Sequence, residues 1–287
     1  GAHVGDLKSS DFKVFIGEKE AEIVSLSADS GPLNVVLFVD TSPSATFKQD
    51  YVRSVAETIA EQFGPDDKLM VMQFNSELKV LSEPNSDRTI TKQAIGKLKT
   101  GDGTSLYDMV KAAFETRICS MEGRTAVFLI TDGVDTTSRK AKYSTSLEAV
   151  ENCGATVYPV YLDTFPNAFG NVGRLPGSMG INDSLQTLLD NLRRNGQLPN
   201  PSKGEMTVSY ERGRLYLNDM VFASGGRAFK ADKVAEKPAV VAEEARSRYF
   251  LTVKLASPLK AGERLPVRVR VARPGLGVMA RGSYIPR

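Results

Sequence analysis

The stretch NVVLFVDTSPS, residues 34–44, decides how this chain folds. It begins with an apolar run, Asn34 to Val39, which is typical of a buried strand. A carboxylate and two hydroxyls follow at alternating positions, as Asp40, Ser42 and Ser44. In open α/β sheets, ligands bind at the carboxyl ends of the strands, and oxygen donors of this kind suit a small hard cation such as Mg²⁺. The stretch therefore predicts a strand with a cation site at its end.

Two later loops offer oxygen donors in similar positions. Thr104 lies in GDGTS, residues 101–105, and Asp132 lies in ITDG, residues 130–133. The Asp-x-Ser-x-Ser triplet alone is common, and an Asp that ends a strand can simply cap the next helix. Because both further loops are expected at the same sheet edge, the combination predicts a metal site. Its expected ligands are Asp40, Ser42, Ser44, Thr104 and Asp132.

Strands and helices alternate along most of the chain, which predicts an α/β fold with a doubly wound, mostly parallel, Rossmann-like sheet. Pro159 falls inside one expected strand, where it cannot donate to the ladder. The expected strands of this sheet are 34–40, 69–74, 78–81, 125–131, 156–162 and 227–230. The expected helices are 47–63, 89–98, 105–118, one ending near 154, 207–223 and 237–248.

The same motifs resemble a von Willebrand factor type A domain over roughly residues 32–163. In that family an Asp-x-Ser-x-Ser loop, a Gly-Thr-Ser loop and a Thr-Asp-Gly loop form the metal-ion-dependent adhesion site. The resemblance implies that the five residues named above bind Mg²⁺, or Mn²⁺ or Ca²⁺ in its place. It also implies that a protein partner supplies a carboxylate to the metal, and that the protein is secreted or extracytoplasmic. Pro43 stands where the family usually has glycine, which stiffens the loop but removes no oxygen donor.

Three parts are expected along the chain. Residues 1–30 form an N-terminal β arm, and residues 31–248 form the main domain. Residues 249–287 form a basic β segment that packs with the arm, with expected strands at 249–255, 265–271 and 278–284. An insertion at about 164–206 is rich in glycine and proline, and then shows a leucine stripe of helical spacing at 183–194. It is either a functional loop or a solvated decoration.

A non-enzymatic binding module is the function that the residues favour. One alternative is a Mg²⁺-dependent phosphoryl hydrolase, because such enzymes also place an Asp at a strand end. Those enzymes usually carry a second Asp two residues on as general acid, and this chain has Ser42 there. His3 is the only histidine, which excludes Ser-His-Asp and Cys-His chemistry. The other alternative is a domain in which the metal is purely structural.

The composition is that of an ordinary soluble domain, with 41% apolar and 25% charged residues and a net charge of +3. No apolar run is long enough to form a transmembrane segment. Ten Lys and Arg but a single acid lie between Arg246 and Arg287. Arg264, Arg268 and Arg270 alternate with apolar residues, as either a contact for an anionic surface or the charged face of a sheet edge. No aromatic stacking platform accompanies this charge, so nucleic acid is not an expected partner.

The two cysteines, Cys119 and Cys153, each come near the end of a predicted helix, just before a strand. Lone cysteines are commonly buried, which favours two free thiols. Since the two helices can be neighbours in the expected fold, a disulfide is the alternative, and it would indicate an oxidising compartment. The sequence has no Cys-x-x-Cys, so a zinc site is not expected.

Overall fold

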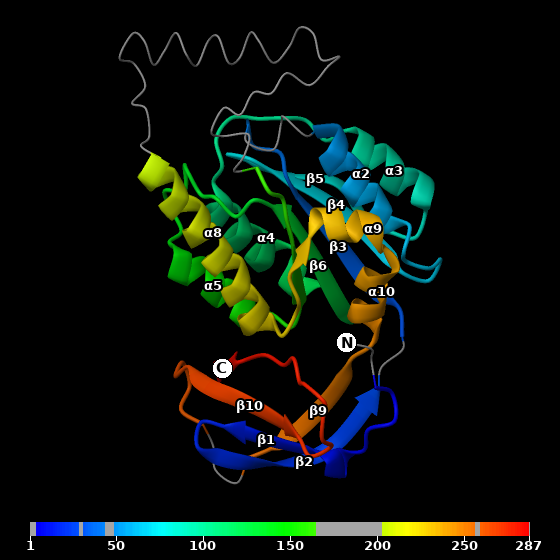
Figure 1. Cartoon of the computed structure of the whole chain (residues 1–287), viewed down its shortest axis with the longest axis vertical. Coiled ribbons are helices and arrows are strands. Elements are labelled where there is room, and N and C mark those ends of the chain that lie inside the picture. Colours follow the sequence, from blue (N-terminus) through cyan, green and yellow to red (C-terminus); the bar gives the residue numbers. More distant parts are fainter. Residues whose placement is uncertain (1–3, 29–30, 44–48, 165–202, 256–258, 287) are drawn as a thin grey trace, which may run out of the picture.

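The apolar run of the opening stretch forms β3, the strand Leu33–Asp40, near the middle of a six-stranded sheet. Residues 4–28, 31–43, 49–164, 203–255 and 259–286 are described by the structure, a computed structural model (Figure 1). The strand order is β5-β4-β3-β6-β7-β8, and all neighbours are parallel except β5 and β4. The remaining strands are β4 (Lys68–Phe74), β5 (Leu78–Asn85), β6 (Arg124–Thr131), β7 (Thr156–Tyr161) and β8 (Phe229–Lys230). The expected doubly wound α/β fold is therefore confirmed.

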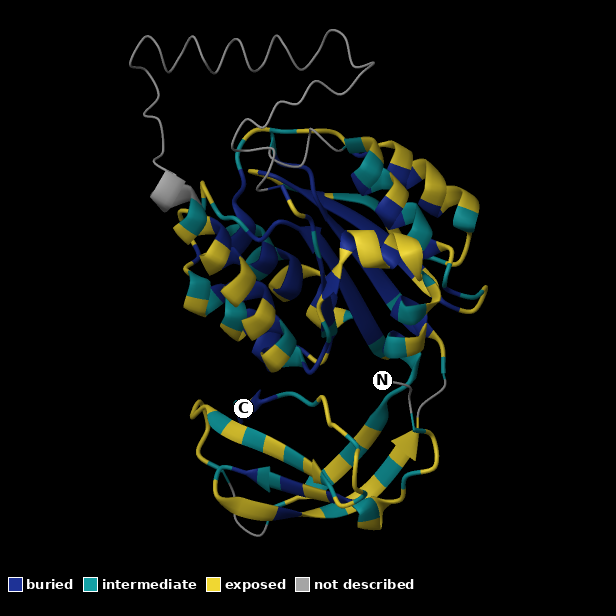
Figure 2. Ribbon diagram, viewed as in Figure 1, coloured by how far each residue is buried: buried dark blue, intermediate teal, exposed yellow. Residues whose placement is uncertain are grey.

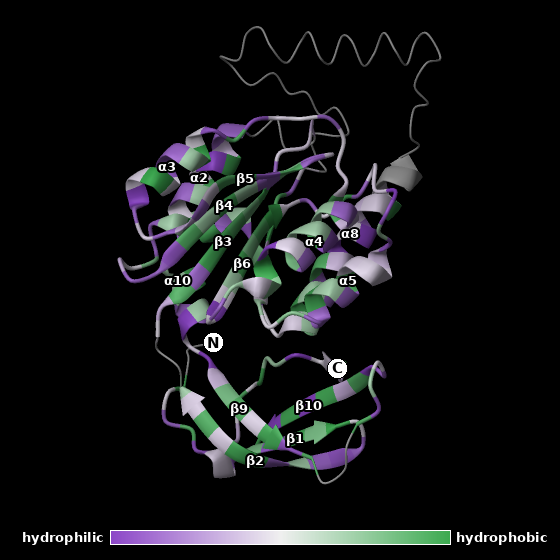
Figure 3. Ribbon diagram, turned by 180° about the vertical axis from the view of Figure 1, so that it is seen from behind, coloured by the Kyte–Doolittle hydropathy of each residue, from purple (hydrophilic) through white to green (hydrophobic). Residues whose placement is uncertain are grey.

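Helices cover both faces of this sheet, which explains why its central strands are apolar without alternation. Every residue from Val35 to Val39 is fully buried (Figure 2). Figure 3 shows long hydrophobic stretches along the central strands β3 and β6. One face packs against α2 (Gln49–Ala60), α3 (Arg88–Gly96), α9 (Ala231–Glu236) and α10 (Ala239–Arg246). The other packs against α4 (Leu106–Thr116), α5 (Tyr143–Glu151) and α8 (Lys203–Ser224).

Several predicted elements differ in their bounds. The closing helix expected at 237–248 is α10, Ala239–Arg246, and a short helix that was not expected, α9, precedes it. Pro238 separates the two, because it cannot continue a helix and instead caps α10. Helix α8 begins at Lys203 rather than near 207. Strand β8 pairs only with Val160 and Tyr161, so β7 is an edge strand at Pro159, where a missing N–H is tolerated. Ser44 and the leucine stripe at 183–194 lie outside the described residues.

A second, antiparallel sheet joins the two ends of the chain in the order β11-β10-β1-β2-β9. Its strands are β1 (Phe12–Ile16), β2 (Lys19–Ala28), β9 (Tyr249–Lys254), β10 (Leu265–Val271) and β11 (Ser283–Tyr284), with a short 3₁₀ turn, η1 (Ser9–Asp11), before β1. The strand expected at 278–284 is thus only two residues long. Gly17 adopts a φ of 63° in the tight turn between β1 and β2, a conformation that favours glycine. Arg268 and Arg270 are exposed and lie over the ring of Phe15, at 5.7 and 5.6 Å from its centroid.

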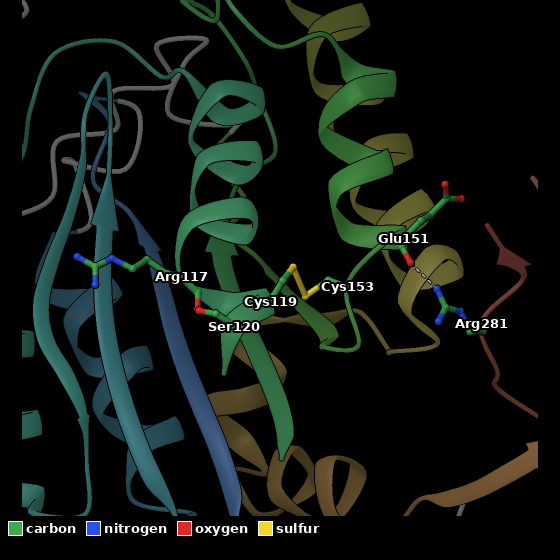
Figure 4. Close-up of a disulfide and its surroundings, with 6 residues drawn as sticks. All are labelled: Arg117, Cys119, Ser120, Glu151, Cys153 and Arg281. Carbon is green, nitrogen blue, oxygen red and sulfur yellow. Dashed lines mark hydrogen bonds between the residues drawn. A yellow bond between two sulfur atoms is a disulfide. The ribbon is translucent and has the colours of Figure 1, made fainter. Parts of the chain in front are cut away.

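Glu151, the last residue of α5, is a buried acid at the junction of the two sheets. Its carboxylate accepts a 2.6 Å hydrogen bond from the hydroxyl of Ser283 and forms an ion pair with Arg264. Arg281 donates to the backbone carbonyl of Glu151 (Figure 4). Arg264, expected either to contact an anionic surface or to lie on the charged face of a sheet edge, pairs instead with a buried acid at the junction.

A disulfide joins Cys119 and Cys153, whose Cα atoms are 5.2 Å apart (Figure 4). Cys119 lies in the short 3₁₀ turn η2 (Ile118–Ser120) after α4, and Cys153 follows α5. The expectation of two buried free thiols was wrong, because α4 and α5 pack side by side and bring the two residues together. Cys153 is buried, whereas Cys119 is exposed. None of the helices in the described ranges is long and apolar enough to cross a membrane.

Candidate metal centre

Asp40 ends β3 at the carboxyl edge of the parallel sheet, and only 1% of its surface is exposed. Its Oδ1 accepts a 2.9 Å hydrogen bond from the backbone N–H of Ser42. Its Oδ2 accepts a 2.6 Å hydrogen bond from the hydroxyl of Thr131, the last residue of β6. A carboxylate oxygen has two lone pairs. The carboxylate is thus oriented by the protein and keeps acceptor capacity for a cation.

Asp132 follows β6, the neighbouring strand, and is 2% exposed. Its Oδ1 accepts from the backbone N–H of Val134 at 3.0 Å, and its Oδ2 accepts from the hydroxyl of Thr164 at 2.7 Å. The Thr164 oxygen is also 2.7 Å from the hydroxyl of Tyr210 on α8. A backbone N–H and a threonine hydroxyl therefore hold this second carboxylate, and Tyr210 contacts that hydroxyl in turn.

The two carboxylates repel each other at this buried edge. Burial, followed by the negative charge of Asp132, raises the pKa of Asp40 to about 7, against the opposing effect of hydrogen bonds from Thr131 and Ser42. No Lys or Arg among the described residues forms an ion pair with Asp40. A divalent cation between the acids would replace the repulsion with attraction.

Thr104 contributes a hydroxyl from the loop before α4. The residue is 4% exposed, yet its hydroxyl makes no hydrogen bond with the described part of the chain. Its backbone is held firmly, since its carbonyl accepts from the N–H groups of Thr136 at 2.8 Å and Thr137 at 3.0 Å. A threonine with a fixed backbone, whose hydroxyl is not committed to a hydrogen bond within the described ranges, fits the role of a metal ligand.

The loops around the site are tied to one another. The N–H of Gly101 donates to the carbonyl of Thr41 at 3.0 Å, and the amide of Asn75 donates to the Thr41 hydroxyl at 3.3 Å. Gly103 has a φ of 67°, and a Cβ there would lie 2.9 Å from the Thr137 side chain. Only glycine suits that position, because a side chain would push apart the loops that carry Thr104 and Asp132.

The structure thus places four of the five predicted ligands at one edge of the sheet, while the fifth, Ser44, is outside the described residues. Ser42 is fully buried next to Asp40. Two further acids, Asp102 and Asp135, lie in the same loops as Thr104 and Asp132. Asp102 is exposed, and Asp135 accepts hydrogen bonds from the Tyr107 N–H and the Ser138 hydroxyl, which holds the start of α4.

Sequence reasoning missed three residues of the site, namely Thr131, Thr164 and Tyr210. Thr131 stands directly before Asp132, so its place at a strand end was a usable signal. Thr164 and Tyr210 are separated by 46 positions, and no local pattern links them.

The donor set suits a hard divalent cation. Its atoms are carboxylate and hydroxyl oxygens, which Mg²⁺, Mn²⁺ and Ca²⁺ prefer over soft metals. No group of three or more His, Cys, Asp or Glu that could hold a metal occurs within the described residues. In the part of the chain that the structure describes, the negative charge at this edge comes from Asp40 and Asp132, and the other predicted donors are neutral hydroxyls.

Comparisons with known proteins agree with this fold. Residues 35–134 match the family model of the von Willebrand factor type A domain. No curated protein matches the chain. An aerotolerance-related membrane protein of Bacteroides fragilis is 11% identical, with a TM-score of 0.50 over 76% of this chain and 100% of that one.

Proximal thread matrix protein 1 of the mussel byssus, in a structure with zinc in its MIDAS motif, is 14% identical with a TM-score of 0.51. The match covers 80% of this chain and 49% of the mussel chain, so the present chain spans about half of that protein. At such identities the two likenesses show the fold alone. Residues 35–134 therefore match the von Willebrand factor type A domain in sequence, and the sheet around them has the Rossmann-like fold of that family.

Proposed function

We propose that this chain is a non-enzymatic, metal-dependent protein-binding module for adhesion or complex assembly. Its centre holds Mg²⁺, or Mn²⁺ or Ca²⁺, and a partner protein docks an acidic side chain on the metal. The proposed ligands are Asp40, Ser42, Ser44, Thr104 and Asp132. The observation that carries this proposal is the pair of buried carboxylates, Asp40 and Asp132, at the same sheet edge as Thr104, whose hydroxyl makes no hydrogen bond with the described residues.

The charge balance of the centre supports the docking of a carboxylate. Two acids can neutralise a divalent cation, but the hydroxyl ligands add no charge. Such a cation stays electrophilic, and Mg²⁺ usually keeps several waters in proteins. A carboxylate from a partner can replace one of those waters. Its negative charge makes its interaction with the cation stronger than that of the water it replaces.

The disulfide supports an extracytoplasmic location. Disulfides persist in oxidising compartments and are rare in the cytosol, where thiols are kept reduced. Cys119 and Cys153 are the only cysteines of the chain, and they are bonded to each other. We therefore infer that the module works outside the cytoplasm.

Isothermal titration of Mg²⁺ and Mn²⁺ into metal-stripped protein tests the proposal. One saturable site is expected in the wild type, and Asp40→Asn should abolish it. Asp102→Asn is the matched control, since it removes the same charge from an exposed position in a neighbouring loop. Equal binding by Asp40→Asn and the wild type would refute the site. Turnover of p-nitrophenyl phosphate that is lost in Asp40→Asn would instead indicate a hydrolase.

A further inference from the structure

Helix α8 approaches the candidate metal centre backbone to backbone. A Cβ at Gly213 of α8 would lie 2.7 Å from the carbonyl oxygen of Gly133, the residue after Asp132. Gly133 itself has a φ of 80°, and a Cβ there would lie 2.9 Å from the Gly213 carbonyl oxygen. Two glycines therefore allow a contact that side chains would prevent. The middle of α8 rests directly on the loop that carries one of the two carboxylates.

A chain of hydrogen bonds reinforces this contact. Oδ2 of Asp132 accepts from the Thr164 hydroxyl at 2.7 Å, and that hydroxyl oxygen is 2.7 Å from the hydroxyl of Tyr210. Asp132 and Thr164 are each 2% exposed, and Tyr210 is 6% exposed. The path runs from the loop after β6, through the segment that follows β7, to α8. It ties together three segments that are distant in the sequence.

The direction of these hydrogen bonds follows from their chemistry. An ionised carboxylate only accepts, so the single hydroxyl hydrogen of Thr164 points to Asp132. The Tyr210 hydroxyl must then donate to Thr164. Burial and the negative charge of Asp132 raise the pKa of Tyr210, which keeps the phenol protonated and able to donate. Hydrogen bonds in such a series strengthen one another in a buried setting.

We propose that Tyr210 and Thr164 are positioning residues of the metal centre, through which helix α8 holds Asp132 in place for the cation. This inference rests on the proposed metal-binding function and assigns part of that site to a helix that lies outside the matched residues 35–134. Outer contacts of this kind fix the orientation of a ligand, and their loss typically weakens metal binding about 10- to 100-fold.

The chain offers a matched pair of variants for the test. Tyr216 lies on the same helix and is fully buried, and its hydroxyl is 2.7 Å from that of Ser146 on α5 instead of that of Thr164. Tyr210→Phe and Tyr216→Phe each remove one buried phenolic hydroxyl. Mg²⁺ affinity, measured by titration calorimetry, should fall about tenfold in Tyr210→Phe and stay unchanged in Tyr216→Phe. Thr164→Val should weaken binding similarly, whereas Thr164→Ser keeps the hydroxyl and should bind as the wild type.

A second measurement needs no metal. Val134 donates its N–H to Asp132, so hydrogen exchange at that amide reports how firmly the loop is held. In metal-free protein, Tyr210→Phe should speed this exchange about fivefold, the effect of one net hydrogen bond, while Tyr216→Phe should not. Equal affinity and equal exchange in the two variants would overturn the proposal.

The two measurements separate the possible failures. A wild-type protein that binds no Mg²⁺ would refute the proposed function. The exchange comparison alone would then decide whether Tyr210 holds Asp132. Faster exchange in Tyr210→Phe but not in Tyr216→Phe would uphold the positioning role, and equal exchange in the two variants would overturn it. A wild type that binds Mg²⁺, together with variants of equal affinity and exchange, would refute the positioning role and leave the proposed function standing.

Discussion

The Ser283 hydroxyl donates a 2.6 Å hydrogen bond to Glu151, and this contact joins the last strand of the chain to the end of α5. The Glu151 side chain is 3% exposed and also pairs with Arg264, which is half exposed. A buried acid thus holds the second sheet against the main domain. Because the carboxylate is almost wholly removed from water, it needs both partners to offset the cost of its burial.

Glu151→Gln should therefore destabilise the protein, because it removes the charge that Arg264 and Ser283 satisfy. We expect a loss of about 1–3 kcal/mol in the free energy of unfolding, below the loss from breaking a fully buried pair, since Arg264 remains solvated. Urea denaturation measures this loss. Glu148→Gln, one turn earlier on α5 and exposed, is the control and should be neutral. Equal stability of the two variants would contradict the role of Glu151.

The raised pKa of Asp40 predicts a specific pH dependence of the metal-free protein. In the unfolded chain the group has its ordinary pKa of 3.8, and in the folded protein burial and then Asp132 raise its pKa to about 7. Between these values the folded protein retains a proton that the unfolded chain has lost. Stability should therefore fall as the pH rises from about 4 to about 7, by a few kcal/mol in all.

Asp40→Asn removes this titration, so its unfolding free energy should depend less steeply on pH over that window. Asp102→Asn should keep the steep dependence of the wild type. Chemical denaturation at a series of pH values, in the presence of a chelator, measures the slopes. Identical slopes in the wild type and Asp40→Asn would show that the Asp40 carboxyl is not perturbed.

Thr104→Ala should weaken Mg²⁺ binding much more than it weakens folding. The Thr104 hydroxyl makes no hydrogen bond with the described residues, so its loss should change the stability of metal-free protein by less than about 1 kcal/mol. As a direct ligand it should matter to the metal, and we expect at least about a tenfold loss of affinity by calorimetry. Thr104→Ser retains the oxygen and should bind normally. Unfolding of Thr104→Ala would contradict the proposed role.

The sheet could be predicted from sequence because local patterns determine it. The run from Val35 to Val39 is apolar throughout, as a strand covered on both faces must be. The positions of Asp40 and Asp132 also follow from local patterns, since each directly follows a predicted strand and parallel strands end at the same edge. The sheet and the loops that carry Asp40 and Asp132 could thus be predicted from the spacing of residues in the sequence.

The contacts between distant segments could not be predicted in this way. Whether Cys119 and Cys153 bond depends on how α4 packs against α5, and neither helix encodes that by itself. Tyr210 reaches Asp132 through Thr164 only because α8 packs against the loop after β6 at Gly213. That is a tertiary contact, which no local pattern encodes. The exposed position of Cys119 likewise follows from packing and not from its own apolar character.

The disulfide between Cys119 and Cys153 should stabilise the fold without affecting the metal centre. It closes a loop with a sequence separation of 34 residues, which in the chain-entropy description corresponds to about 3–4 kcal/mol. Replacement of both cysteines by serine should lower the unfolding free energy by about that amount. Because Cys119 and Cys153 lie just before β6 and β7, at the opposite end of the sheet from Asp40 and Asp132, Mg²⁺ affinity should be unchanged in the folded variant.

Reduction of the wild type by dithiothreitol should reproduce the loss of stability and leave the double variant unaffected. An altered Mg²⁺ affinity at full folding would show that the two ends of the sheet are coupled.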